Sequence, residues 1–190
     1  GFDPAAPFSL PDAPSFFAAL EAAPDPAAHA RGLRIGWLGD VGGSCPMEPG
    51  ILETCEAALK AFETLGAAVE PCTLDMPSDD VWSSWTTLRH WLTAANMRGD
   101  YEDPARRALL KPEVIWEIED GLKMSALDIS AAFRKRTDHH RALEALFARY
   151  DLLAVPSAQV WPFPAEQRYP QEIAGVKMDT YHRWMELMLP

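Results

Sequence analysis

The sequence predicts an α/β fold in which helices cover a sheet. A strand, a helix and a second strand follow one another between residues 33 and 74, and a third strand pattern at 152–155 comes directly after a long helix. Strand–helix–strand units are nearly always parallel and right-handed. We therefore expect these three strands to lie in one sheet, with the first two parallel.

The first unit, residues 33–74, is marked by clear local signals. The segments "LRIGWL" at 33–38 and "AAVEPCTL" at 67–74 have the apolar composition of strands. Between them, apolar residues recur at helical spacing from Ile51 to Leu65, with Pro49 near the first turn and Gly66 just past the end. These signals predict an amphipathic helix at 51–65.

Three more helices are predicted before the third strand. A helix begins at Ser78, where a hydroxyl and the two following carboxylates suit a helix start, and it ends at Gly99. Pro112 suits a first turn, which predicts a short helix at 112–120 closed by Gly121. The capping box "SALD" at 125–128 then begins a long helix that runs to about Tyr150.

The stretch "YDLLAVPSAQVWPFP" at 150–164 follows this long helix. Its apolar run predicts a buried strand at 152–155 that Pro156 ends, because proline cannot donate to a sheet ladder. We expect the prolines and aromatic residues after the strand to form a wall.

Residues 1–31 differ in composition from the rest of the chain. They are rich in proline and alanine, and "PSFFAAL", with Ser15 as its cap, is the one segment expected to form a helix. We interpret residues 1–31 as an N-terminal surface arm and residues 32–190 as the α/β segment.

Composition excludes several classes of function. The net charge of -11 argues against nucleic-acid binding by a basic face, because phosphate contacts need clustered Lys and Arg. No apolar stretch approaches the length of a membrane span. The three cysteines cannot all pair within the chain and none belongs to a CxxC motif, which favours a reducing, cytoplasmic setting.

The motif search yields neither a catalytic group nor a metal site. "IGWLGDVGG" at 35–43 does not match a GxGxxG loop, and "GGSCP" at 42–46 lacks the second glycine of a nucleophile elbow. His139 and His140 point about 100° apart on a helix, so they cannot share a metal ion. We expect no metal and no cofactor.

One face of the long helix combines apolar and charged residues. Steps of four and three predict the inward positions Ile129, Phe133, Arg136, His140, Leu143, Phe147 and Tyr150. Arginine is almost never buried unpaired, so Arg136 meets either a carboxylate of the protein or an anionic group of a ligand. Tryptophans at 82, 85 and 91 pose the same choice between core and ligand pocket.

Longer stretches resemble the amidase signature family. They are "GLRIGWLGDVGGSCPMEPGILETCEAALKAFETLGAAVEP", "LLKPEVIWEIEDGLKMSALDISAAFRKRTDHHRALEALFARYDLLAVPS" and "DTYHRWMELMLP", which together cover about residues 31–190. The resemblance implies an incomplete portion of an amidase-signature fold, with a mixed sheet flanked by helices in αβα layers. It also implies hydrolysis of carboxylic amides by a serine nucleophile, with a second serine on a cis peptide and a lysine.

No residue of this chain matches those catalytic groups, which lie upstream of this segment in the family. We therefore expect residues 1–190 alone to be inactive and to supply scaffold and the walls of a substrate funnel. By its place in the long helix, Arg136 resembles an arginine that glutamine-using members employ to hold the substrate carboxylate. His140, Trp85 and Trp161 complete the predicted substrate-binding set.

The expected partner is a small-molecule amide substrate, without nucleic acid or membrane, and a homodimer is left open. Two alternatives to an amidase segment also stay open. One is a non-catalytic α/β protein-interaction domain that binds through its tryptophans and the "VWPFP" loop at 160–164. The other is the amidase-like component of a glutamyl-tRNA amidotransferase.

Overall fold

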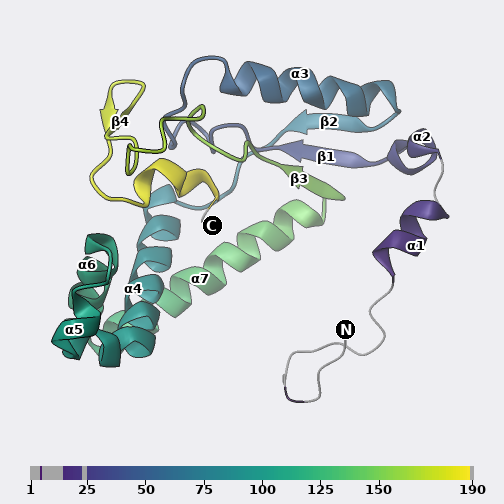
Figure 1. Cartoon of the computed structure of the whole chain (residues 1–190). Coiled ribbons are helices and arrows are strands. Elements are labelled where there is room, and N and C mark those ends of the chain that lie inside the picture. The colour runs from purple at the N-terminus through teal and green to yellow at the C-terminus, as the bar shows by residue number, and fades with distance from the viewer. Residues whose placement is uncertain (1–4, 6–14, 23–24, 189–190) are drawn as a thin grey trace.

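A computed structural model describes residues 5, 15–22 and 25–188 (Figure 1). Its central sheet contains β1 (Arg34–Trp37), β2 (Ala68–Pro71) and β3 (Leu152–Ala154) in the order β2-β1-β3. Strand β1 pairs in parallel with both neighbours. The α/β fold class, and the placing of these strands in one sheet with the first two parallel, are confirmed. The burial predicted for the third strand is wrong, since Leu152 is exposed and Leu153 and Ala154 are half-buried.

Antiparallel pairing occurs in a separate hairpin within the described residues. It joins β4 (Glu172–Ile173) to β5 (Val176–Lys177). The side chains of Ile173 and Met178 are buried together with Val160, and Phe163 and Trp184 pack against them. The wall expected after the third strand thus includes a small apolar cluster of its own.

Helices lie on both sides of the central sheet. Helix α3 (Ile51–Thr64) packs on one face, where Leu59 joins Ile35 and Ala67 in a buried cluster. Helix α7 (Ala126–Phe147) lies on the opposite side of the strands (Figure 1). Tyr150, just beyond α7, covers Gly36 of β1 so closely that a Cβ there would lie 2.8 Å from its ring.

The longest helix, α4 (Ser78–Glu102), packs against α6 (Pro112–Gly121) and α7. Its predicted start is confirmed, although Pro77 occupies the N-cap position and no side chain caps the helix. The predicted end at Gly99 is wrong. Glycine costs a helix only about 1 kcal/mol, which packing against two neighbours offsets.

The true end of α4 is set by a cap that the sequence analysis missed. Asp103 is extended, and its side chain accepts hydrogen bonds from the backbone of Ala105 and Arg106, so that the short helix α5 (Pro104–Arg107) begins there. An Asp–Pro pair is a common helix start, since proline suits the first turn. That signal was present at 103–104.

The same Asp–Pro signal explains a second missed helix. Helix α1 (Phe16–Glu21) forms as predicted, and the Ala18 amide donates to Ser15 Oγ at 3.2 Å. Helix α2 (Pro26–Ala30) was not predicted, and its cap is Asp25. The remainder of the expected arm, residues 1–4, 6–14 and 23–24, lies outside the described residues.

The capping box before α7 is confirmed. Ser125 Oγ accepts from the Asp128 amide at 3.2 Å, and Asp128 Oδ2 accepts from the Ser125 amide at 2.8 Å. Helix α7 ends at Phe147, three residues before the predicted end, and β3 follows at Leu152. Among the described residues, no helix combines the length and the apolar character that crossing a membrane requires.

Gly121 marks the closest approach of α4 and α6. A Cβ at this position would lie 2.3 Å from the carbonyl oxygen of His90 and 2.8 Å from the Cβ of Ala94. Gly121 lies at the end of α6, as predicted, but it does not act as a left-handed helix cap. The backbone is not left-handed here, and the glycine is needed for the contact between the helices.

A matched pair of substitutions tests this contact. Gly121→Ala forces backbone apart, so we expect it to lower the free energy of unfolding by about 1–3 kcal/mol. Gly99→Ala, on α4, meets nothing within 4 Å and should raise the free energy of unfolding by about 0.5–1 kcal/mol. Urea denaturation measures both, and equal effects of the two substitutions would contradict the assignment.

Candidate functional site

A cavity lies where the three parallel strands end. Its volume is about 180 Å³, and each strand contributes wall residues from the loop that follows it: Leu38, Leu74 and Val155. The carboxyl ends of the strands point toward the start of α4 and toward the short C-terminal helix η1 (Arg183–Met188), drawn in yellow in Figure 1. Ligands of open α/β sheets bind in this position. We call it the strand-end cavity.

Most of the strand-end cavity is apolar, and the few polar groups come from four elements. Trp82 of α4 and Leu143 of α7 add apolar surface, while Glu186, His139, Ser44 and Ser78 supply polar atoms. Ser44 Oγ donates to the Val41 carbonyl at 3.0 Å. This bond gives Ser44 the structural role of fixing its own turn.

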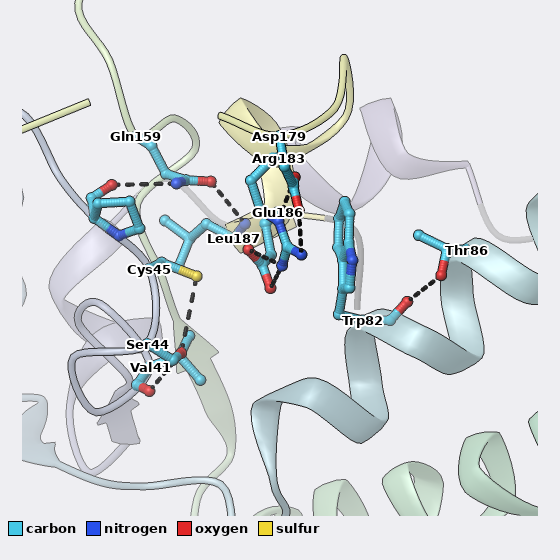
Figure 2. A network of polar contacts seen from close by, with 11 residues as sticks. Val41, Ser44, Cys45, Trp82, Thr86, Gln159, Asp179, Arg183, Glu186 and Leu187 are labelled. Carbon is cyan, nitrogen blue, oxygen red and sulfur yellow. Dashed lines mark hydrogen bonds and ion pairs between the residues drawn. The ribbon is translucent and has the colours of Figure 1, made fainter. Parts of the chain in front are cut away.

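Arg183 organises one side of the strand-end cavity (Figure 2). Its Nη1 donates to both carboxylate oxygens of Glu186 at 2.9 Å. Its Nε donates to Asp179 at 3.2 Å, and the guanidinium lies 3.9 Å from the centre of the Trp82 ring. Two carboxylates and an indole face thus hold Arg183 in place.

The two carboxyl groups bound to Arg183, Glu186 and Asp179, have pKa shifts in opposite directions. Burial raises the pKa of Glu186 above its ordinary value despite the bonds from Arg183. The more exposed Asp179 shows the opposite shift, because hydrogen bonds from Arg183 lower its pKa. Burial, with a smaller contribution from Glu186, raises the pKa of the Cys45 thiol to about 11, which leaves it protonated and unreactive at neutral pH.

Gln159 ties the loop after β3 to both ends of this region. Its Nε2 donates to the Pro46 carbonyl at 3.1 Å, and its Oε1 accepts from the Leu187 amide at 3.1 Å (Figure 2). The side chain is fully buried. It therefore fixes η1 against the loop that carries Ser44 and Cys45.

A second cavity, of about 370 Å³, adjoins the strand-end cavity between α4 and α7. We call it the helix cavity. Val81 and His139 line both cavities, and Trp85, Arg89 and Arg136 line the helix cavity. The structure thus brings together two of the predicted substrate-binding residues, Trp85 and Arg136.

Arg136 forms no ion pair with any carboxylate of the described residues, whereas Arg89 pairs with Glu117 at 3.2 Å. Trp85 stacks on Trp82, with ring centres 5.8 Å apart. The helix cavity therefore combines an aromatic wall with two guanidinium groups. Burial, followed by the neighbouring His140, lowers the pKa of His139, which is neutral at pH 7.

The predicted inward face of α7 is off by one residue in places. Ala132 and Leu146 are buried, while Phe133 and Phe147 are exposed. His139 lines both cavities, and His140 points outward and lies 3.3 Å from Glu144. The inward placement of Phe133, Arg136, His140 and Phe147 was therefore wrong. All four side chains are exposed, although Arg136 lines the helix cavity and Phe133 makes an edge-on contact with Trp91 of α4.

Trp161 lies apart from both cavities. Its Nε1 donates to the Pro49 carbonyl at 3.0 Å, and its backbone amide donates to Glu48 Oε2 at 2.7 Å. It lines a third cavity beside the start of α3, together with Ile51 and Cys55. The described contacts of Trp161 connect the loop after β3 to the N-terminus of α3.

A buried polar cluster surrounds Glu117 of α6 and was not predicted from the sequence. His182 Nε2 lies 2.9 Å from Glu117 Oε1, and Thr93 Oγ1 donates to Oε2 at 2.9 Å, while Arg89 adds a third partner. Burial alone would raise the pKa of Glu117, but bonds from His182 and Thr93 lower it below its ordinary value. The cluster joins α4, α6 and the segment before η1.

No group of three or more His, Cys, Asp or Glu side chains among the described residues has the geometry to hold a metal ion. The chemistry that these side chains offer is binding. The residues that line the two cavities provide apolar walls, guanidinium donors and one buried carboxylate acceptor, Glu186.

Comparison with known proteins supports the resemblance. No protein-family model matches the chain. An acylamidase of Rhodococcus erythropolis is 28% identical over 158 residues, which are 78% of this chain and 30% of the relative. A bacterial aryl acylamidase crystal structure, described as belonging to the amidase signature enzymes, matches with a TM-score of 0.83 and 26% identity over 100% of this chain and 39% of its own.

This chain has the fold of the amidase signature enzymes. A second crystal structure, of an amidase, matches that fold with a TM-score of 0.69 and 17% identity, over 84% of this chain and 36% of its own. The chain spans between 30% and 39% of the length of these amidases. The predicted likeness to part of an amidase-signature enzyme is confirmed.

The Glu117 cluster makes a prediction about pH. Because the pKa of Glu117 is lowered by folding, its ionised form stabilises the fold at neutral pH, and this stabilisation is lost as the pH falls through the depressed pKa, below the ordinary carboxyl value of about 4.3. Glu117→Gln should lower the free energy of unfolding by about 3 kcal/mol at pH 7. The difference from the unmodified chain should shrink on acidification.

Glu119→Gln is the matched control on the same helix. Glu119 is 44% exposed and pairs with Arg107, so this change should cost less than about 1 kcal/mol. Denaturant titrations at several pH values measure both variants. If the free energy of unfolding of Glu117→Gln differed from that of the unmodified chain by the same amount at every pH, the lowered pKa of Glu117 would be contradicted.

Proposed function

We propose that this chain is part of an amidase that hydrolyses carboxylic amides, to which it contributes scaffold and the walls of the substrate funnel. The observation that carries the proposal is the match of the whole chain to the amidase signature fold, with an apolar cavity at the carboxyl ends of its parallel strands. The substrate is a small-molecule amide. A cytoplasmic location and a homodimer stay predictions.

The reaction is acyl transfer to a serine followed by hydrolysis. The serine oxygen attacks the amide carbonyl, and hydrogen-bond donors hold the oxyanion that forms. We place the nucleophile outside residues 1–190. The role of this chain is to bind and orient the substrate and to exclude water with the walls of the strand-end cavity.

Arg136 is proposed to hold a substrate carboxylate. A guanidinium without a described carboxylate partner, on the wall of a cavity, suits bidentate pairing with a ligand anion. Trp85 is proposed as an apolar wall beside it. His140 and Trp161 stay predicted substrate contacts, and their described positions add no support to that role.

The first test is hydrolysis of a chromogenic anilide. We expect the longer protein that includes this chain to hydrolyse 4-nitroacetanilide, and residues 1–190 alone to be inactive. Release of 4-nitroaniline measures both. Turnover by highly purified residues 1–190 that is abolished by Ser44→Ala would contradict the placement of the nucleophile.

The second test concerns Arg136. In the active protein, Arg136→Ala should raise the Michaelis constant for an anilide bearing a carboxylate by about tenfold to a hundredfold, as expected when one charge-assisted hydrogen bond of about 1.5–3 kcal/mol is lost. A neutral anilide should be affected far less. Arg134→Ala is the control, because Arg134 lies on the same helix, donates to Ser130 and does not line the helix cavity. An equal increase in the Michaelis constant for both substrates would contradict a contact between Arg136 and the substrate carboxylate.

A further inference from the structure

We propose that the strand-end cavity binds a single ring carrying a hydrogen-bond donor, and that Glu186 selects for that donor. The inference deepens the proposed amide hydrolysis and rests on it for the identity of the ligand as part of an amide substrate. It names a specificity residue, Glu186, and a chemical class, a phenol or an aromatic amine. Four features of the cavity support it.

The first feature is size. The strand-end cavity measures about 180 Å³, and engineered apolar cavities of about 150 Å³ bind benzene. Leucine, valine and methionine side chains and the Trp82 indole form most of the wall. One six-membered ring with a small substituent therefore matches the space.

The second feature is a buried acceptor on the wall. Glu186 is 8% exposed and lines the strand-end cavity. Both of its oxygens accept from one nitrogen of Arg183. A carboxylate offers about four acceptor positions, so each oxygen keeps capacity for a donor from the cavity side.

The third feature is rigidity. Arg183 is bound to Asp179 at 3.2 Å and stacked on Trp82 at 3.9 Å, so it cannot swing away from Glu186 without losing both contacts (Figure 2). The Leu187 amide next to Glu186 is held by buried Gln159. The acceptor is thus fixed in place before a ligand enters, which lowers the entropic cost of binding.

The fourth feature is the character of the other polar groups on this wall. Ser44 already donates its hydroxyl to Val41 at 3.0 Å, and the lowered pKa of His139 keeps that imidazole neutral. Ser78 and Cys45 also line the cavity, and the raised pKa of Cys45 keeps its thiol protonated. Glu186 is therefore the carboxyl group among the described lining residues. A phenol or aromatic amine gives it a donor, whereas a benzoate brings a second negative charge into an apolar cavity.

Asp179 provides a matched control for Glu186. Both carboxylates bind Arg183, but Asp179 lies outside the strand-end cavity and its side chain is 62% exposed. Asp179→Asn and Glu186→Gln each remove one negative charge that pairs with Arg183. Only Glu186→Gln changes the acceptor that faces a ligand.

The experiment measures binding of three probes of similar shape, 4-methylphenol, toluene and benzoate, by ligand-observed NMR titration of the protein. We expect 4-methylphenol to bind about tenfold more tightly than toluene, the gain from one hydrogen bond to a charged group, and benzoate to bind most weakly. Glu186→Gln should reduce the preference for the phenol severalfold and relieve the exclusion of benzoate. Asp179→Asn, which keeps an oxygen that accepts from Arg183, should leave the order of the three probes unchanged and alter the ratios less than Glu186→Gln does.

Equal binding of phenol and toluene, absence of binding by all three probes, or an identical preference in Glu186→Gln would overturn the proposal. Glu186→Met, which keeps the length of the side chain but removes the acceptor, serves as the second variant if Glu186→Gln is poorly folded. Binding is read without turnover. A protein that shows the Glu186-dependent preference but hydrolyses no anilide would contradict the proposed function and leave the ligand class standing.

Discussion

The ion pairs of Arg183 hold together the part of the molecule where the sheet ends. A three-stranded sheet fixes the positions of its strand ends, but the chain segments that follow them need separate restraints. Arg183 provides one by joining η1 to Trp82 of α4 through a stacked contact and to Asp179 just upstream. The same guanidinium binds Glu186, whose side chain lines the strand-end cavity.

Two buried carboxyl groups illustrate how the number of hydrogen-bond donors sets the direction of a pKa shift. Glu117 accepts from His182, Thr93 and Arg89, and the balance lowers its pKa. Glu186 has Arg183 as its described partner and faces an apolar cavity, and the balance raises its pKa. Desolvation raises the pKa of both groups, and only a sufficient set of donors reverses it. The first carboxylate is therefore committed to structure, and the second keeps capacity for a ligand.

The sequence was sufficient for the fold wherever a local signal determines the outcome. The strand–helix–strand unit and the Ser125 capping box depend on short-range chemistry and were predicted. Gly99 and the inward face of α7 were misjudged because tertiary packing decides them. A helix pattern with steps of three and four does not distinguish Ala132 from Phe133. In the folded protein Ala132 is buried, while Phe133 is exposed and makes an edge-on contact with Trp91 of α4.

The site was less predictable, because its residues come from segments far apart in the chain. Arg136 and Trp85 could be singled out as charged or aromatic residues on helical faces, yet Glu186 carries no such signal. It lies in a short 3-10 helix, and its relation to Trp82 and Val155 exists only after the sheet has formed. The folded arrangement places a fixed carboxylate in one cavity and two guanidinium groups in the adjoining one, with Val81 and His139 on the wall between them. Under the proposed function, a substrate that reaches both cavities contacts Glu186, which is paired with Arg183, in one and Arg136 in the other.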